Sequence, residues 1–339
     1  MTSPAKRDWK ARLQALGSTR YHHRHPFNLL MHGGRLELGD LRLWVANRYY
    51  YQTRIPIKDA LIVAKSEDPG FRRVWVQRVL DHDGRGDRRP GGLELWMRLG
   101  RALGLTPEQL EAQRELLPPV RRACDDYVDL VRRSDLVTSV ASSLTECFAG
   151  ELMQARIDAW QQHYRGVAHE ALRYFEERVT RSADDAAYAL WFVDQHAITP
   201  GQQQRCLDAF ERKCDILWRL LSAVYIEGRR ERRPKLAARA SLVGSLGATG
   251  QTGRRSAMLL VPEKALELNP TAAALLERCT GAATLDEIIE ALSADHQVDQ
   301  PTVELDIATF VGELEVRRLL VFDEPTRARP THRTVRSLR

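Results

Sequence analysis

All seven tryptophans and all nine tyrosines of this 339-residue chain lie at or before Tyr225. The residues that follow contain two aromatic side chains, Phe310 and Phe322. Aromatic side chains bury the most apolar surface per residue, so this distribution predicts one large core followed by a much smaller domain. Residues 229–255 are rich in Arg, Gly, Ala and Ser and lack aromatics, which predicts a basic flexible linker. We therefore expect domains at 1–228 and 256–325, and a basic tail at 326–339.

The first domain has the pattern of a helical bundle. Apolar residues recur at helical spacing, as in Leu41, Trp44 and Val45, and strand signals are nearly absent. Helix starts are indicated at Asp40, Thr106-Pro107 and Thr199-Pro200, where a side-chain oxygen can cap the first turn. The sequence predicts an all-α bundle whose core is filled by tryptophans.

The second domain has a mixed pattern. A short β-like run, Met258–Val261, is followed by Asn269-Pro270, which opens an apolar helix to about Cys279. Thr284 caps a further helix, and the run Leu319–Phe322 resembles the wing of a winged-helix module. We expect a small α+β domain.

Composition excludes several classes of protein. The longest apolar run, Ala186–Val193, is far shorter than the roughly 20 residues of a membrane-spanning helix, and the N-terminus has no apolar signal region, so we expect a cytoplasmic protein without a membrane partner. The five cysteines are scattered singly, which is typical of reduced core residues. The net charge of +6 comes from the basic segments at 229–239 and 327–339, so it gives little reason to expect a nucleic-acid partner.

Metal and nucleotide motifs are missing. The cluster His22-His23-Arg24-His25 invites a metal interpretation, but adjacent histidines in an extended or turn segment point apart. No Glu-x-x-His occurs, which argues against a di-iron carboxylate bundle. The sequence also lacks the phosphate-binding, dinucleotide-binding and nucleophile-elbow patterns.

Three helices carry pairs of polar residues four positions apart. These pairs are Arg48 with Gln52, Arg78 with His82, and Tyr174 with Arg178. Each pair could simply lie on a surface face, and His82 could complement the dipole at the end of its helix. As a functional residue, His82 would be a general acid or base.

Buried charge is expected at two further places. Glu146 stands among small and apolar residues and needs a facing cation, for which Arg156 is a candidate, and Lys213 lies between apolar positions of the last long helix. A bundle interior lined by these cations would suit a small molecule with several carboxylates. The set comprises Arg48, Arg78, Arg156, Arg178 and Lys213.

Four stretches, Tyr21–Phe27, Trp44–Asp59, Trp75–Gly84 and Ser142–Phe148, closely resemble the pyrroloquinoline-quinone (PQQ) synthase family, and the similarity extends over about residues 5 to 225. The later segment, from Leu259 through Asn269 to Leu320, resembles the small peptide chaperone of the same biosynthetic pathway. The resemblance therefore implies a natural fusion of the two.

The synthase resemblance implies a seven-helix fold akin to haem oxygenase and a homodimer. It also implies the last step of PQQ biosynthesis, which is ring closure and eight-electron oxidation of the quinone precursor by O2, with release of H2O2. The family uses no metal or organic cofactor. The chaperone resemblance implies binding of the precursor peptide, by strand addition or groove docking, and its delivery to a radical SAM enzyme.

The resemblance also assigns residues. It implies catalytic roles for His82, Tyr174, Arg178, His22 and Glu146, with His82 moving protons and with Tyr174 and Arg178 stabilising reduced oxygen species. The residues implied to bind substrate are Arg48, Gln52, Lys58, Arg78, Tyr127, Thr145, Arg156 and Lys213. One position departs from the family pattern: Met153 stands where a histidine is expected near the oxygen pocket, and a thioether cannot donate a proton.

Three other interpretations remain open at this point. The chain could be a related helical oxidase that acts on another small aromatic compound, or a carrier that binds a quinone without turnover. A nucleic-acid role for the winged-helix-like segment is the third, and it would require sequence-specific binding at physiological salt, because nonspecific attraction weakens steeply as salt rises.

Overall fold

The computed structural model describes residues 4–86, 89–244, 257–262 and 264–323. The chain divides into two compact units. The first comprises Met1–Gly228 with Glu304–Gly312, and the second comprises Arg229–Val303 with Glu313–Arg339. The predicted basic tail, 326–339, lies outside the described residues.

The first unit is helical throughout its described residues up to Gly228, as predicted. Its α-helices run in the order α1 (Pro4–Arg20), α2 (Pro26–His32), α3 (Leu38–Ala64), α4 (Pro69–Asp83), α5 (Gly92–Ala102), α6 (Pro107–Glu111), α7 (Pro118–Arg133), α8 (Leu136–Ala141), α9 (Ala149–His163), α10 (Arg173–His196) and α11 (Pro200–Glu227). Short 3-10 helices lie at η1 (His22–Arg24), η2 (Ser142–Phe148) and η3 (His169–Leu172). The described chain thus has more α-helical segments than the seven that the resemblance implied, because several are only one or two turns long.

Local capping chemistry places the helix starts. Thr106 and Thr199 each accept a hydrogen bond from the backbone N–H three residues on, which confirms both predicted caps. At α3 the cap is Glu37 instead of Asp40, and the Asp40 carboxylate accepts from the Glu37 N–H at 3.1 Å. Asp40 therefore belongs to the capping box but stands inside the first turn.

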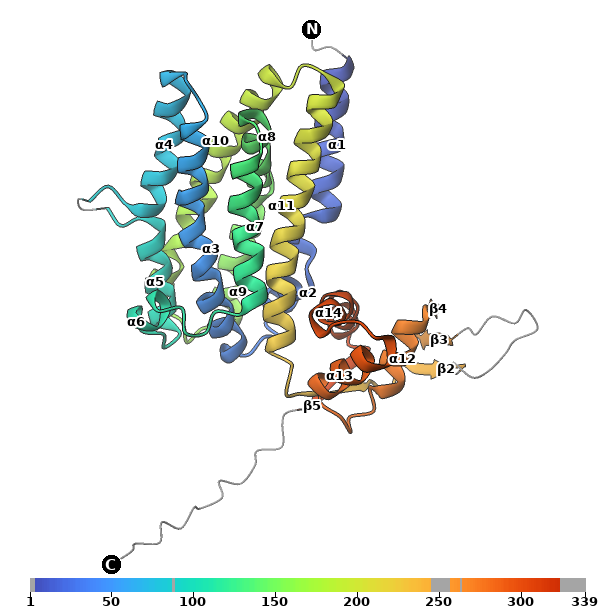
Figure 1. Cartoon of the computed structure of the whole chain (residues 1–339). Helices are drawn as coiled ribbons and strands as arrows, with labels where there is room; N and C mark the ends of the chain where they lie inside the picture. The colour runs from blue at the N-terminus through green and yellow to red at the C-terminus, as the bar shows by residue number, and fades with distance from the viewer. Residues whose placement is uncertain (1–3, 87–88, 245–256, 263, 324–339) are drawn as a thin grey trace, which may run out of the picture. The chain divides into compact units, whose positions relative to one another are not determined.

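Aromatic side chains fill the bundle core, as predicted. Trp44 of α3 lies 5.3 Å from Trp96 of α5 and 6.4 Å from Trp160 of α9, measured between ring centroids. All three rings are at most 1% exposed. Helix α3 packs between α4 and α7, α7 packs against α11 (Figure 1), and α10 packs against α9. These helices carry most of the inward-facing polar residues described below.

The second unit contains two small sheets and three helices. Strands β2 (Ser241–Val243), β3 (Ala257–Val261) and β4 (Lys264–Leu268) form an antiparallel sheet, and β1 (Arg233–Leu236) pairs antiparallel with β5 (Leu320–Asp323). The helices are α12 (Pro270–Arg278), α13 (Leu285–His296) and the two ends of α14 (Gln300–Val316), whose middle, Glu304–Gly312, belongs to the first unit. Asn269 and Thr284 cap α12 and α13, and the β-like run at 258–261 is a strand, so these predictions are confirmed.

The predicted linker over 229–255 is wrong in its first half. Residues 233–236 and 241–243 form strands β1 and β2, and the remainder, 245–256, lies outside the described residues. The Arg229 side chain is 1% exposed and its Nε lies 2.9 Å from the Glu315 carboxylate. Order in this aromatic-poor stretch comes from ion pairs and strand pairing with residues some 80 positions later, which local composition cannot reveal.

No helix among the described residues is long and apolar enough to cross a membrane.

Candidate active site

A small buried cavity of about 40 Å³ lies inside the helical bundle. Seven of the predicted site residues line it: His22, Arg48, His82, Thr145, Glu146, Tyr174 and Arg178. The other six, Gln52, Lys58, Arg78, Tyr127, Arg156 and Lys213, are buried, and four of them, Gln52, Arg78, Arg156 and Lys213, contact a lining residue directly. Helical spacing therefore predicted inward-facing groups on several helices, and folding brings them together.

Helix α3 presents its polar face to the cavity. Arg48 and Gln52 are 6% and 0% exposed, which excludes a surface position for this pair. The Tyr174 hydroxyl of α10 donates a hydrogen bond to Gln52 Oε1 at 3.0 Å, so Gln52 fixes the phenol from α3. The Gln52 Nε2 is buried without a hydrogen-bond partner in the described structure.

His82 has an assignable tautomer. Its Nδ1 lies 3.1 Å from the carbonyl oxygen of Arg78, and a carbonyl can only accept, so Nδ1 carries the proton and Nε2 keeps a lone pair. Burial, reinforced by the charge of Arg178, lowers the pKa of His82 to about 4. The ring is neutral near pH 7, so it does not act as an imidazolium at the helix C-terminus. His82 instead offers a basic nitrogen in the wall of the cavity.

Two arginines and two carboxylates form a network beside His82. Arg178 donates to Glu146 and, at 3.2 Å, to Asp185, and Arg78 Nη1 lies 3.1 Å from the other oxygen of Asp185. Burial raises the pKa of the Glu146 carboxyl, but Arg178 and Arg78 outweigh it and hold the pKa at about 2. The facing cations of Glu146 are thus Arg178 and Arg78, and not Arg156 as the sequence suggested.

A third carboxylate, that of Asp59 on α3, holds cations of α3 and α4. Asp59 Oδ1 accepts from Lys58 Nζ at 2.6 Å and from Trp75 Nε1 at 2.9 Å, and Arg78 Nε lies 3.4 Å away. Asp59 is 0% exposed. Lys58 also donates to the Ser143 hydroxyl at 2.9 Å. Asp59 therefore positions Lys58 and Arg78 together.

The remaining cations have no carboxylate. Among the residues that the structure describes, no carboxylate oxygen lies within 4.0 Å of the charged nitrogens of Arg48, Arg156 or Lys213. Burial, together with Arg48 and Arg156, also lowers the pKa of His22, both of whose ring nitrogens lack hydrogen-bond partners in the described structure. Lys58, Arg78 and Arg178 are thus neutralised by Asp59, Glu146 and Asp185, whereas Arg48 and Arg156 are not.

Met153 lines the cavity and contacts Arg156. Its Sδ lies 3.7 Å from Nη1 of Arg156, while Nη2 of Arg156 donates to Asn28 Oδ1 at 3.1 Å. The contact between the thioether and the guanidinium is a weak one. Arg156 is therefore held mainly by Asn28 and by stacking on Trp44, whose ring centroid lies 5.0 Å from the guanidinium carbon.

Sequence reasoning missed several residues of the site. Tyr21, Tyr51, Ile55, Ala149 and Leu217 line the cavity, and Asp59 and Asp185 hold its arginines. Two of these had a sequence signal. Tyr51 follows Arg48 by three residues and so shares its helical face, and Asp59 is the direct neighbour of Lys58.

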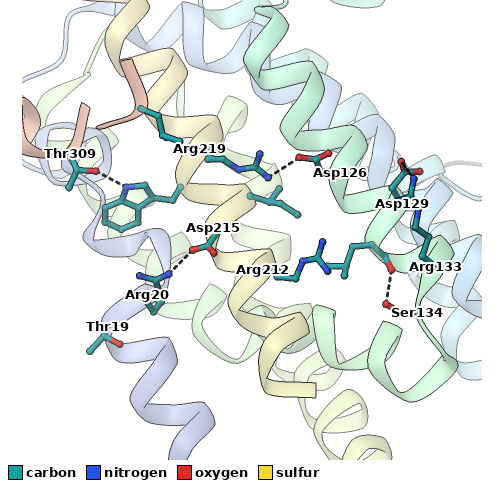
Figure 2. Close-up of a pocket in the computed structure, with 14 residues that line it drawn as sticks. Thr19, Arg20, Asp126, Asp129, Arg133, Ser134, Arg212, Asp215, Arg219 and Thr309 are labelled. Carbon is teal, nitrogen blue, oxygen red and sulfur yellow. Dashed lines mark hydrogen bonds and ion pairs between the residues drawn. The ribbon is translucent and has the colours of Figure 1, made fainter. Parts of the chain in front are cut away.

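A larger hollow of about 1000 Å³ lies elsewhere in the helical unit, along a wall formed by α1, α7, α11 and α14. Figure 2 shows Arg20 directed at Asp215 and Arg219 directed at Asp126, and the nitrogen–oxygen distances are 3.0 and 2.9 Å. These charges are exposed and already paired, so we expect them to add little binding energy for a ligand. The buried cavity is the better candidate for chemistry.

Within the described ranges, no group of three or more His, Cys, Asp or Glu side chains is arranged to hold a metal ion.

Comparison with known proteins agrees with this geometry. Residues 10–223 match the TENA/THI-4/PQQC family, and residues 256–320 match coenzyme PQQ synthesis protein D. The chain belongs to the TENA/THI-4/PQQC family and carries an additional PqqD domain. The chain is 32% identical to the bifunctional coenzyme PQQ synthesis protein C/D of Methylorubrum extorquens, over 92% of this chain and 94% of the relative.

Other members of the TENA/THI-4/PQQC family are similar to the helical unit. The pyrroloquinoline-quinone synthase of Xanthomonas campestris is 45% identical over 64% of this chain and 86% of its own length. That of Cronobacter sakazakii is 43% identical over 67% and 90%. These relatives, named as synthases, confirm the prediction that the chain is an enzyme.

Solved structures show the fold of the helical unit. A domain from Shewanella denitrificans with a haem-oxygenase-like fold matches with a TM-score of 0.54 at 13% identity, over 64% of this chain and 90% of that one. A TenA homologue from P. horikoshii matches with a TM-score of 0.53 at 14% identity, over 65% and 99%. The haem-oxygenase-like fold predicted from the sequence is therefore confirmed.

Proposed function

We propose that the helical unit is a cofactor-free oxidase that completes PQQ biosynthesis. It closes the last ring of the bicyclic quinone precursor and oxidises it with O2, releasing H2O2. The observation that carries this proposal is that the buried arginines of the site fall into two kinds. Arg48 and Arg156 have no carboxylate partner in the described structure, whereas Arg178 is ion-paired and lines the cavity with the neutral base His82.

The unneutralised cations supply the binding energy for a polyanion. Burying a cation without a partner is costly, and substrate carboxylates would remove that cost by forming charge-assisted hydrogen bonds. The cavity of about 40 Å³ is much smaller than a bicyclic substrate, so binding requires the lining side chains to move apart. The haem-oxygenase-like bundle would then close over the substrate.

The chemistry of the proposed reaction follows from His82, Tyr174 and Arg178. His82 Nε2 takes a proton from the substrate during ring closure and again during each two-electron oxidation. In each oxidation the quinol loses two electrons and two protons, and O2 gains both to become H2O2. Arg178 and the Tyr174 hydroxyl stabilise the negative charge that develops on oxygen. The substrate supplies all the electrons.

The test is anaerobic mixing of the chelator-treated, full-length protein with the quinone precursor, followed by admission of O2. Absorbance, peroxide and product mass are recorded. Oxidised product with peroxide, and its loss in His82→Asn, supports the proposal. If substrate binds and no oxidised product forms, with iron or flavin absent and then supplied, the oxidase assignment fails and the carrier interpretation gains support. Exposed His163→Asn is the matched control variant.

For the second unit we propose binding of the precursor peptide, for delivery to a radical SAM enzyme. The sheet β2–β3–β4 has two edge strands, and an extended peptide can add to such an edge. Fluorescence anisotropy of the labelled precursor peptide with the full chain tests this. Saturable binding that a scrambled peptide does not compete supports it, and equal binding of both peptides would contradict it.

A further inference from the structure

The Lys213 amine occupies an unusual position for a lysine. Its side chain, on α11, is 1% exposed, and its Nζ lies within hydrogen-bond distance, 2.7 Å, of the Tyr51 hydroxyl oxygen of α3. Nζ also lies 3.3 Å from the ring centroid of Tyr127 and 4.2 Å from that of Tyr51. Within the described structure, the Tyr51 hydroxyl is the side-chain group that lies within hydrogen-bond distance of Lys213 Nζ. Tyr51 in turn lines the cavity, which Lys213 does not.

The charges around Lys213 disfavour an ammonium ion. From α3 it faces the cations Arg48 and Lys58, and from η1 the ring of His22. Cys124 and Tyr127 face it from α7, and Glu146 acts on it from η2 at longer range. Burial and the repulsion from Arg48 and Lys58 lower the pKa of Lys213 well below its usual value.

We propose that Tyr51 and Lys213 form a second proton-transfer pair of the site, in addition to His82. Tyr51, which lines the cavity, exchanges a proton with the substrate, and its hydroxyl passes a proton to or from the Lys213 amine. This inference rests on the proposed oxidase function and names a residue pair for it.

The step balances as a pure proton relay. A substrate O–H or N–H gives its proton to Tyr51 Oη, while the O–H proton of Tyr51 moves to Lys213 Nζ, and no electrons are transferred. The resulting ammonium is stabilised by the faces of the Tyr51 and Tyr127 rings. The proton returns by the same route when O2 has been reduced and the peroxide needs it. Tyr51 is the catalytic residue, and Lys213 acts through it.

The kinetic test separates proton transfer from simple charge. Lys213→Arg keeps a cation but cannot accept a proton, and Tyr51→Phe keeps the ring but interrupts the relay. We expect both to lower kcat for O2-dependent oxidation about 100-fold, with KM for the precursor within about threefold for Lys213→Arg, and to abolish one ionisation in the pH profile of kcat. Lys10→Arg, on α1 and paired with Asp194, is the control. A Lys213→Arg enzyme with the wild-type kcat would overturn the proposal.

A second measurement needs no turnover. The chain has seven lysines, so ¹³C-lysine labelling of the full-length protein gives few Cε resonances to follow with pH. We expect one of them to titrate well below the other six, and to be absent in Lys213→Arg. If every lysine titrates together, the pair is refuted even if the oxidase is active. If the wild type never oxidises the precursor, the proposed function fails while the titration still decides the state of Lys213.

Discussion

His25 gives the helical unit a stability that depends on pH. Its Nδ1 accepts the backbone N–H of Phe27 at 3.0 Å and thereby caps α2, and its Nε2 lies 3.2 Å from the Ser222 hydroxyl. A nitrogen that accepts a backbone N–H must be unprotonated, so the folded protein requires the neutral ring. The ring is 0% exposed, and burial lowers the pKa of His25 to about 3, from 6.5.

The magnitude follows from linkage. Because the pKa is lower in the folded state, the unfolded chain binds the proton first, and stability falls as pH drops below 6.5. At pH 5 the difference of 1.5 pH units corresponds to about 2 kcal/mol of lost unfolding free energy. Above pH 6.5 the group costs nothing.

The perturbation is His25→Asn, which keeps a good cap residue and removes the titration. Urea unfolding is followed at pH 7.5 and 5.0 by tryptophan fluorescence, which reports the helical unit because all seven tryptophans lie before Tyr225. We expect the variant to be less stable at pH 7.5, by about 1–2 kcal/mol, since it loses the contact of the ring with Trp218 at 4.7 Å. Its loss of stability between the two pH values should be about 2 kcal/mol smaller than in the wild type.

Exposed His163 provides the control, because His163→Asn is the same substitution at a surface position. If His25→Asn and the wild type lose the same free energy between pH 7.5 and 5.0, then His25 does not carry the proton linkage, and the tautomer deduced from its hydrogen bonds is wrong.

Three further outcomes are expected from the site. Asp59→Asn leaves buried Lys58 without its anion, so the unfolding free energy should fall by about 3 kcal/mol in urea titrations, and an unchanged value would contradict the anchoring role. Glu146→Gln should cost about 3 kcal/mol at pH 7, the equivalent of a pKa of about 2 against 4.5; this stability is present above pH 4.5 and is lost as pH falls toward 2, so wild type and variant should converge in acid denaturation curves. Met153→Leu should change the O2 consumption rate less than about twofold, because the thioether contributes one weak contact; a tenfold loss would give the sulfur a direct role.

Local chemistry made much of the fold predictable. A hydroxyl or amide before a proline caps a helix by a bond spanning three residues, and Thr106, Thr199 and Asn269 do so in the structure. The segment at 229–243 was misjudged because its order depends on partners far along the chain. Arg229 pairs with Glu315, and Pro234 lies opposite Phe322 in the β1–β5 ladder. No window of local composition contains both partners.

The same distinction applies to the site. Spacing along one helix showed that Arg48 and Gln52 share a face, but not that Gln52 accepts the Tyr174 hydroxyl from a helix 122 residues later. Asp185 was missed because nothing in α10 marks it out, and its role arises only where Arg78 and Arg178 converge. Charges that face one another across a bundle are set by helix packing, which the pattern of one helix does not encode.

The carboxylates of the site divide its buried arginines into two groups, those that are ion-paired and those that are not. Arg78 and Arg178 are held by Asp59, Glu146 and Asp185 before any ligand arrives, so their geometry is already fixed when charge develops in a reaction. Arg48 and Arg156 have no such anion in the described structure, and a polycarboxylate would provide it. A site with every cation neutralised would bind such a substrate weakly, and a site with none neutralised would be costly to fold. In the arrangement found here, Arg78 and Arg178 are therefore fixed before a ligand arrives, and Arg48 and Arg156 are available to recognise it.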